Sequence, residues 1–139
     1  KTALAAYTIG SDVENLTYTG TAAFAGTGNA LDNRIVGSAA GSNTLTGGAG
    51  DDILIGGAAA DFFVYASNWG HDTIMYFEVS GTAHDTIKID RTTFADWASL
   101  LAVSILSGND TIITADADNT ITLKNVAVSS LQSADFQFV

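Results

Sequence analysis

The chain has 139 residues, the length of one ordinary domain, and carries 15 acidic residues against 5 basic ones, a net charge of −10. The basic residues form no cluster, which argues against nucleic acid as a partner and against holding an anionic polysaccharide by charge alone. Cysteine is absent, so disulfides play no part, and no apolar stretch reaches the roughly 20 residues of a membrane-spanning helix.

The acidic residues are skewed in kind. Only Glu14 and Glu78 are glutamates, so the other thirteen of the 15 acids are aspartates. Aspartate suits turns and short-reach metal coordination, whereas glutamate suits helices, so the skew favours cation-binding turns. In other extracellular proteins disulfides stabilise the folded chain, and a structural metal ion is the candidate for that role here. Because the chain begins with Lys1 and shows no signal peptide, we expect it to be a fragment of a longer protein.

The first third of the chain predicts short strands joined by turns. Its expected inward-facing residues are Val13, Leu16, Tyr18 and Phe24. Two degenerate nine-residue units follow, at 28–36 and 38–46. Each has an asparagine at its sixth position, Asn33 in the first and Asn43 in the second, with a large apolar residue two places later. Gly41 holds the fourth position of the second unit.

Residues 47–64 are the most regular part of the sequence. They form two consecutive units of the pattern Gly-Gly-x-Gly-x-Asp-x-U-x, where U is a large apolar residue, and only Ala59 departs from it. Glycine permits positive φ and lets backbone carbonyls turn inward. Asp52 and Asp61 supply the hard anionic oxygens that suit Ca²⁺. The apolar residue, Leu54 in the first unit, is expected on a short strand pointing into a core shared by stacked units.

Beyond residue 64 the Asp-x-U core recurs without glycine pairs. It begins at Asp72, Asp85 and Asp110, and we interpret these segments as later strands of the same solenoid or of a sheet that continues it. Apolar residues at helical spacing predict one helix from Asp90 to Val103, with Thr93 and Asp96 as a capping box and the apolar stripe in the core. That stripe is Phe94, Trp97, Leu100 and Leu101. Residues 119–126 and 135–139 predict two further strands, and residues 129–134 predict a turn or a single helical turn.

Histidine and aromatic side chains are further candidates for a chemical role. His71 and His84 each precede an aspartate, which suggests a transition-metal site, but they occupy a variable turn position and are expected in solvent. Tyr65, Trp69 and Tyr76 could line a sugar-binding surface, although core or rim packing is the interpretation we favour. No nucleophile–base arrangement, P-loop or His-Glu-x-x-His motif is present, so we expect no enzyme.

From about Val13 to Ile87 the sequence resembles the RTX, or hemolysin-type calcium-binding, domains of Gram-negative bacteria. The resemblance rests on the lead-in at 13–17, the step at 28–33 and the nonapeptides at 47–64, whose pattern is the calcium-binding repeat of that family. The acid-then-apolar end, residues 135–139, is similar to the uncleaved C-terminal signal of proteins exported by type I secretion.

The resemblance implies an all-β fold, a right-handed parallel β-roll or β-solenoid with a short helix and a C-terminal strand segment. Residues 1–139 would form a single module, with repeats at about 28–75 and a capping and secretion segment at about 76–139. Calcium would lie between stacked turns, with Asn43 on Asp61 along one side and Asn33, Asp52 and Asp72 along the other. The implied metal ligands are Asn33, Gly41, Asn43, Gly48, Gly50, Asp52, Gly57, Ala59, Asp61 and Asp72.

The function implied is that of a non-catalytic, calcium-binding module that ends a larger secreted, extracellular protein. Acidic turns would repel one another in a calcium-poor cytoplasm and keep the chain competent for a type I exporter. Outside the cell, Ca²⁺ would close the roll, so metal-binding free energy becomes folding free energy. The alternative is a carbohydrate-binding accessory module, for an alginate-like polysaccharide, of a secreted epimerase, lyase or adhesin. An exposed aromatic or basic strip along one sheet face would favour the alternative.

Overall fold

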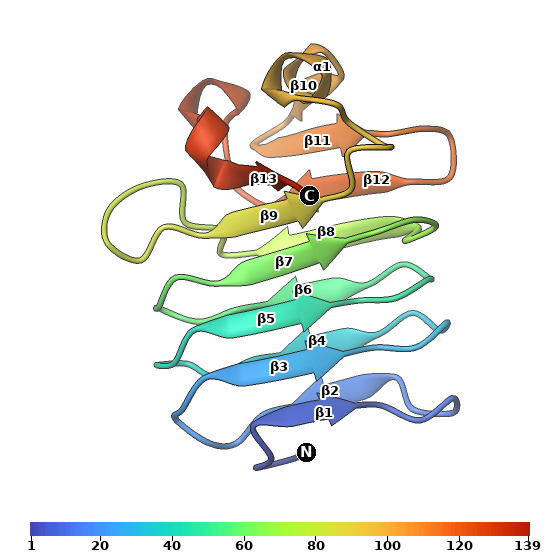
Figure 1. Ribbon diagram of the computed structural model, residues 1–139, viewed down its shortest axis with the longest axis vertical. Helices are drawn as coiled ribbons and strands as arrows, with labels where there is room; N and C mark the ends of the chain where they lie inside the picture. The colour runs from blue at the N-terminus through green and yellow to red at the C-terminus, as the bar shows by residue number, and fades with distance from the viewer.

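The computed structural model describes all residues, 1–139, and consists mainly of short strands that wind upward in stacked coils (Figure 1). The first nine strands alternate between two sheets, which we call the odd sheet and the even sheet. The odd sheet runs in the order β1 (Ala6–Thr8), β3 (Phe24–Thr27), β5 (Asn43–Thr46), β7 (Phe62–Tyr65), β9 (Thr86–Ile89) and β13 (Phe136–Phe138). The even sheet runs in the order β2 (Asn15–Thr17), β4 (Arg34–Val36), β6 (Ile53–Ile55), β8 (His71–Met75), β12 (Thr120–Leu123), β11 (Asp110–Thr114) and β10 (Ser104–Ser107).

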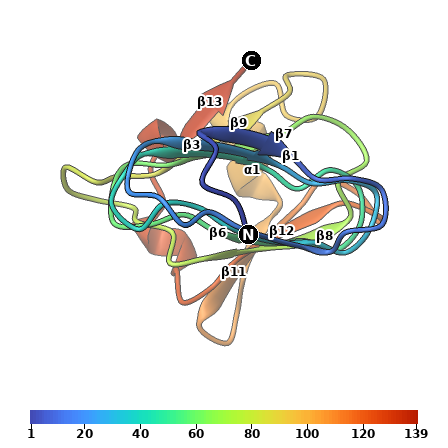
Figure 2. The same cartoon turned by 90° about the horizontal axis from the view of Figure 1, so that it is seen from below.

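Neighbouring strands of the repeats are parallel and in register. Ile35 pairs with Leu54 and Leu54 with Ile74 in the even sheet, and Leu45 pairs with Phe63 in the odd sheet. Seen along the stack, successive coils superimpose into a flattened ring with one sheet on each broad side (Figure 2). Side chains alternate along a strand, so the eighth position of every unit points between the sheets. This architecture confirms the predicted parallel β-roll.

The apolar core fills the space between the two sheets as one continuous cluster. Leu54 and its equivalents in neighbouring coils are fully buried, which identifies the U position as the core position. Leu16, Tyr18 and Phe24 are also buried, as expected. The expectation was wrong for Val13, which is 42% exposed. Val13 lies in the turn before β2, where its carbonyl accepts a hydrogen bond from the Asn29 side chain.

The C-terminal part closes the last coil by extending both sheets. In the even sheet, β12 adds to β8 in parallel, and β11 and β10 follow as an antiparallel meander. In the odd sheet, β13 adds to β9 in parallel. The rings of Phe136 and Trp97 pack at 5.4 Å between centroids, so the last strand contacts the helix α1 (Trp97–Ala102). Two 3₁₀ turns, Val128–Ser130 and Ser133–Asp135, connect β12 to β13.

The helix is shorter than the predicted Asp90–Val103 segment. Asp90 accepts hydrogen bonds from the backbone N–H and the hydroxyl of Thr92, and this turn keeps the chain out of a helix. The N-cap is Asp96, whose capping box is completed by Ser99, so the predicted role of Thr93 was wrong. Leu100 is buried, whereas Leu101, predicted in the core, is exposed. No helix is long and apolar enough to cross a membrane.

Candidate metal-binding site

The sixth-position side chains of the repeats lie in two columns at the turns. The column before the even strands, which we call the even edge, contains Asn33, Asp52 and Asp72. The column before the odd strands, the odd edge, contains Asn43, Asp61 and Asp85. The structure therefore stacks these turns in the predicted order. It also places Asp85, which was not among the predicted metal ligands, next to Asp61 in the odd-edge column.

A ladder of hydrogen bonds joins each column. Along the even edge, the Asn33 N–H donates to Asp52 Oδ1 at 2.7 Å and the Asp52 N–H donates to Asp72 Oδ1 at 2.9 Å. Along the odd edge, the Asn43 N–H donates to Asp61 Oδ1 at 2.7 Å and the Asp61 N–H donates to Asp85 Oδ1 at 2.8 Å. One oxygen of each aspartate is thus committed to the backbone of the preceding coil.

The two edges differ in what happens to the second carboxylate oxygen. On the even edge, Oδ2 of Asp52 and Oδ2 of Asp72 are buried and have no hydrogen-bond partner. Both residues are 1% exposed, so water does not readily substitute. The hydroxyl of Tyr65 is a third buried atom without a well-formed hydrogen bond; it lies close to the Asp72 carboxylate, and burial together with that carboxylate raises the pKa of Tyr65 well above its usual value. Partnerless buried oxygens of this kind call for a cation or a proton.

The electrostatics of the even edge agree with the geometry. Burial raises the pKa of Asp72 to about 8; the backbone N–H of Asp52 opposes this rise, the charge of Asp52 reinforces it, and the nearby Tyr65 hydroxyl opposes it. Burial likewise raises the pKa of Asp52 to about 6, with the N–H of Asn33 acting against it and the charges of Asp32 and Asp51 adding to it. Two stacked carboxyls therefore resist ionisation unless a positive charge lies beside them.

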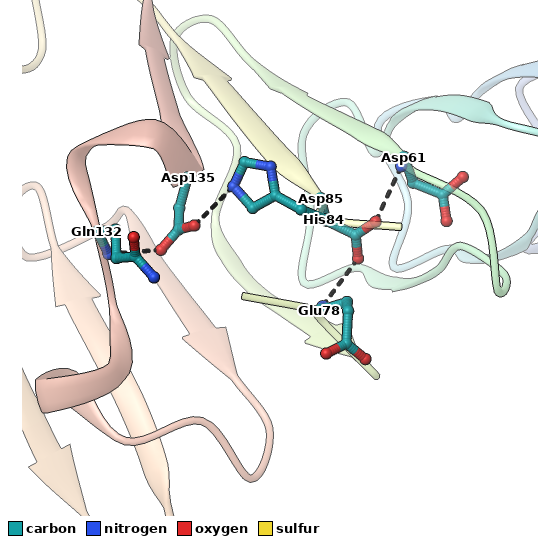
Figure 3. Close-up of polar contacts among 6 residues, drawn as sticks. All are labelled: Asp61, Glu78, His84, Asp85, Gln132 and Asp135. Atoms are coloured by element: carbon teal, nitrogen blue, oxygen red, sulfur yellow. Dashed lines mark hydrogen bonds and ion pairs between the residues drawn. The ribbon is translucent and has the colours of Figure 1, made fainter. Parts of the chain in front are cut away.

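On the odd edge every carboxylate oxygen is used. Asp61 Oδ2 accepts the Gly57 N–H at 2.6 Å, and its Oδ1 accepts from both the backbone and the side-chain nitrogen of Asn43. Asp85 Oδ2 accepts the Glu78 N–H at 3.0 Å, while its Oδ1 accepts the Asp61 N–H (Figure 3). Burial still raises the pKa of Asp85 to about 6, although these two backbone bonds oppose it.

The glycines of the motif serve two different purposes. Gly48 and Gly50 have φ of 111° and 101°, which a side chain would strain. Gly47 and Gly56 instead leave room for the carboxylate, because a Cβ on either would lie 2.0 Å from Oδ2 of Asp52 or Asp61. The first glycine of each unit is therefore required by the aspartate five residues later.

The remaining turn positions in the predicted ligand set are Gly41, Gly57 and Ala59, and the structure places all of them in the odd-edge turns. The Gly41 carbonyl accepts a hydrogen bond from Asn43 Nδ2 at 3.0 Å. No group of three or more His, Asp or Glu side chains is arranged to hold a metal ion. A cation at these turns would therefore have to draw on backbone carbonyls as well as on carboxylates.

Sequence reasoning missed one contact beside the even column, two residues before Ile121, which pairs with Asp72. Asn119 precedes β12, and its Oδ1 accepts the N–H of Trp69 at 2.8 Å, which continues the contacts between turns into the C-terminal part. The Nδ2 of Asn119 donates a hydrogen bond to Asp116 Oδ1 at 2.8 Å. The sequence Asn119-Thr120-Ile121 resembles the Asn-x-U step of the repeats, but its register is shifted by two residues, because Ile121 pairs with Asp72 and Leu123 with Ile74. The strand predicted to begin at Asp110 is β11, which lies in the sheet that continues the solenoid and is antiparallel to β12; the Asp110 carboxylate pairs with Lys124 Nζ at 2.6 Å.

His84 also departs from its expected exposure. Its Nε2 lies 2.8 Å from Oδ1 of Asp135, which is fully buried and whose Oδ2 accepts the Gln132 N–H (Figure 3). This contact ties the long turn before β9 to the segment before β13. His71 is exposed, as predicted. Tyr65 and Trp69 are buried and pack edge to face, so core packing, the favoured interpretation, applies to both, while Tyr76 is 73% exposed.

Comparison with known proteins places the repeats in a family. The sequence matches the family described as RTX calcium-binding nonapeptide repeat in four copies, over residues 27–63, 38–74 and 106–123. The last range contains Asn119 and both strands that flank its turn. No curated protein matched the chain.

Proposed function

The chain belongs to the RTX calcium-binding repeat family and is a Ca²⁺-binding β-roll, and from this premise we propose that its calcium sites lie along the even edge. The observation that carries the proposal is the pair of buried, partnerless oxygens, Asp52 Oδ2 and Asp72 Oδ2. Ca²⁺ takes six to eight hard oxygens and tolerates irregular geometry, so two carboxylates with turn carbonyls suit it. The proposed ligands are Asp52 and Asp72 with carbonyls of the turn at Gly48 and Gly50.

The proposed mechanism is calcium-coupled folding. Without a cation, the roll must bury two carboxyl groups that keep one oxygen each unsatisfied, which costs free energy. A bound calcium ion supplies the missing positive charge, so its binding free energy adds to the stability of the folded chain. The ladder bonds hold Oδ1 of both aspartates in place, which leaves Oδ2 as the oxygen free for the metal.

Circular dichroism and thermal unfolding in EGTA, in Ca²⁺ and in Mg²⁺ test this function. We expect Ca²⁺ to raise the melting temperature and Mg²⁺ to substitute poorly, because Mg²⁺ demands near-octahedral geometry and gives up its water reluctantly. Asp52→Asn should weaken the calcium response, whereas Asp12→Asn, an exposed position, should not. An identical melting curve with EGTA and with Ca²⁺ would refute the proposal.

We propose further that residues 1–139 act as one non-catalytic module of a secreted protein of a Gram-negative bacterium, with repeats at about 28–75 and a C-terminal segment at about 76–139. One apolar core from Ile9 to Phe136 supports a single module. Calcium-coupled folding, as proposed above, would make the chain fold after export, where calcium is abundant.

We propose two roles for the C-terminal tail. Before folding it is the signal that a type I exporter recognises, and after folding it forms the last strand of the odd sheet. Phe136 is buried against Trp97 and its strand pairs with β9, so folding withdraws Phe136 and the strand backbone from a receptor, while Gln137 and Val139 stay exposed. Deleting residues 135–139 from the parent protein, co-expressed with a matching exporter, should abolish secretion. Normal secretion of the truncated protein would contradict the address role. The purified truncated chain should also melt lower in Ca²⁺, because it loses a buried strand.

A further inference from the structure

Asn43 makes a set of contacts that resembles a metal site with the metal replaced. Its Nδ2 donates to Asp61 Oδ1 at 2.7 Å, to the Ser38 carbonyl at 3.0 Å and to the Gly41 carbonyl at 3.0 Å. One carboxylate and two turn carbonyls thus converge on a single atom. These are the oxygen types that calcium takes from protein turns.

The orientation of this amide is fixed by its partners. Asn43 Oδ1 accepts the Ser38 N–H at 2.6 Å, so the oxygen must face that donor and the NH₂ group must face the three acceptors. The side chain is 1% exposed, and every polar atom in it has a partner. No side-chain oxygen of Asn43 or Asp61 is left without a partner to receive an ion at this step.

The even edge provides the contrast. At its acidic step, Asp52 meets Asp72, neither side chain has an amide, and each keeps one oxygen without a hydrogen-bond partner. Asn33 precedes Asp52 as Asn43 precedes Asp61, but Asn33 Nδ2 donates to the Val13 carbonyl and to Asn29 Oδ1 and makes no hydrogen bond to Asp52. On the odd edge Asn43 Nδ2 donates to Asp61 Oδ1 and the Gly57 N–H donates to Asp61 Oδ2, so neither oxygen of Asp61 lacks a partner.

We propose that the carboxamide of Asn43 takes the place of a cation on the odd edge, so that this coil closes without calcium and Ca²⁺ is confined to the even edge. The inference rests on the proposed calcium function and states which residue decides where that function operates. It replaces the expectation that Asn43 coordinates through its neutral oxygen, because that oxygen is already occupied by Ser38.

Asn43→Asp tests the inference by removing the donor and adding an oxygen of the same size. Four oxygens would then face one another, from Ser38, Gly41, Asp61 and the new carboxylate. We expect isothermal titration to give one more Ca²⁺ per chain than in the wild type. In EGTA the variant should unfold at a lower temperature than the wild type, and saturating Ca²⁺ should restore the loss.

Two variants serve as controls. Asn43→Ala removes the amide without adding charge, so it should melt lower in EGTA and bind no additional calcium. Asn109→Asp adds the same charge at an exposed hairpin turn and should change neither quantity. The wild-type titration reports on the proposed function, whereas the difference between Asn43→Asp and wild type reports on this inference, so the two can fail separately.

Nuclear magnetic resonance of the wild-type protein provides a test that needs no variant. The side-chain NH₂ protons of Asn43 should exchange slowly with solvent and should keep their chemical shifts as Ca²⁺ is added. Loss or displacement of those resonances on calcium addition would overturn the inference. So would an unchanged calcium stoichiometry in Asn43→Asp, or failure of that variant to fold in saturating Ca²⁺.

Discussion

Replacing Asp72 by asparagine should make the calcium-free protein more stable and its response to calcium weaker. The substitution keeps the size of the side chain and its Oδ1, which accepts the Asp52 N–H. It replaces the partnerless Oδ2 by an NH₂ group, for which the unpaired Tyr65 hydroxyl is a suitable acceptor. Asp72→Asn would therefore do at the even edge what Asn43 does at the odd edge.

The size of the effect follows from the raised pKa of Asp72. In the unfolded chain this carboxyl ionises with the ordinary pKa of 3.8, whereas in the folded protein its pKa is about 8. At pH 7 the group must take up a proton to fold, at about 1.4 kcal/mol for each pH unit above 3.8, or roughly 4 kcal/mol in total. Removing that cost should raise the melting temperature in EGTA by about 10 °C.

The pH dependence has a defined sign. A folded pKa above the unfolded one means that the folded state binds the proton more tightly, so the calcium-free protein is favoured below pH 3.8. Stability is then lost progressively as the pH rises toward about 8. Because Asp72→Asn has no such proton, its advantage over the wild type should be small at pH 4 and should grow up to about pH 8.

Urea unfolding in EGTA at pH 4, 5.5, 7 and 8 would measure this difference, with Asp12→Asn as the exposed control. Calorimetric titration at pH 7 would measure the loss of calcium binding. If Asp72→Asn is less stable than the wild type in EGTA at pH 7, Asp72 is not held in the folded state at a free-energy cost. The argument for a cation at this position would then fail.

Two further changes test the fold around the site. Leu54→Ala should lower the free energy of unfolding by about 2–5 kcal/mol even in saturating Ca²⁺, because Leu54 is fully buried. Urea unfolding would measure this loss. A loss below about 1 kcal/mol would contradict the position of Leu54 in the core. His84→Gln should loosen the C-terminal strand by weakening the bond to buried Asp135, without changing the calcium stoichiometry. Hydrogen exchange at the amides of Phe136–Phe138 should speed up at least several-fold, and unchanged protection there would exclude a positioning role for His84.

The columns could be predicted from sequence because they depend only on spacing. Asp52 and Asp72 stand in the sixth position of successive coils, and a parallel register must bring such positions together. The difference between Asp52 and Asp61 could not be predicted, since the two occupy identical places in consecutive repeats. The Gly57 N–H donates to Asp61 Oδ2, whereas Asp52 Oδ2 has no such donor, and Asn43 Nδ2 donates to Asp61 Oδ1, whereas Asn33 Nδ2 turns to the Val13 carbonyl and to Asn29.

Contacts between distant segments could not be predicted from the sequence either, because each partner lies outside the local pattern of the other. His84 and Asp135 are 51 residues apart, and nothing in either local pattern points to the other. Asn119 sits 50 residues after Trp69, beyond a helix and a hairpin that interrupt the repeat. The helix was overestimated because the turn that Asp90 forms with Thr92 competes with helical hydrogen bonds. Which turn carbonyls bind calcium stays a prediction.

The ladder bonds at the edges have a direction along the chain. In each of them the donor amide comes first and the acceptor carboxylate follows 18 to 24 residues later, as from Asn43 to Asp61 and from Asp61 to Asp85. Because the acceptor always lies one coil nearer the C-terminus, no coil can complete its own edge without the coil that follows it. The final coil therefore depends on the C-terminal segment, which adds β12 to β8 and β13 to β9.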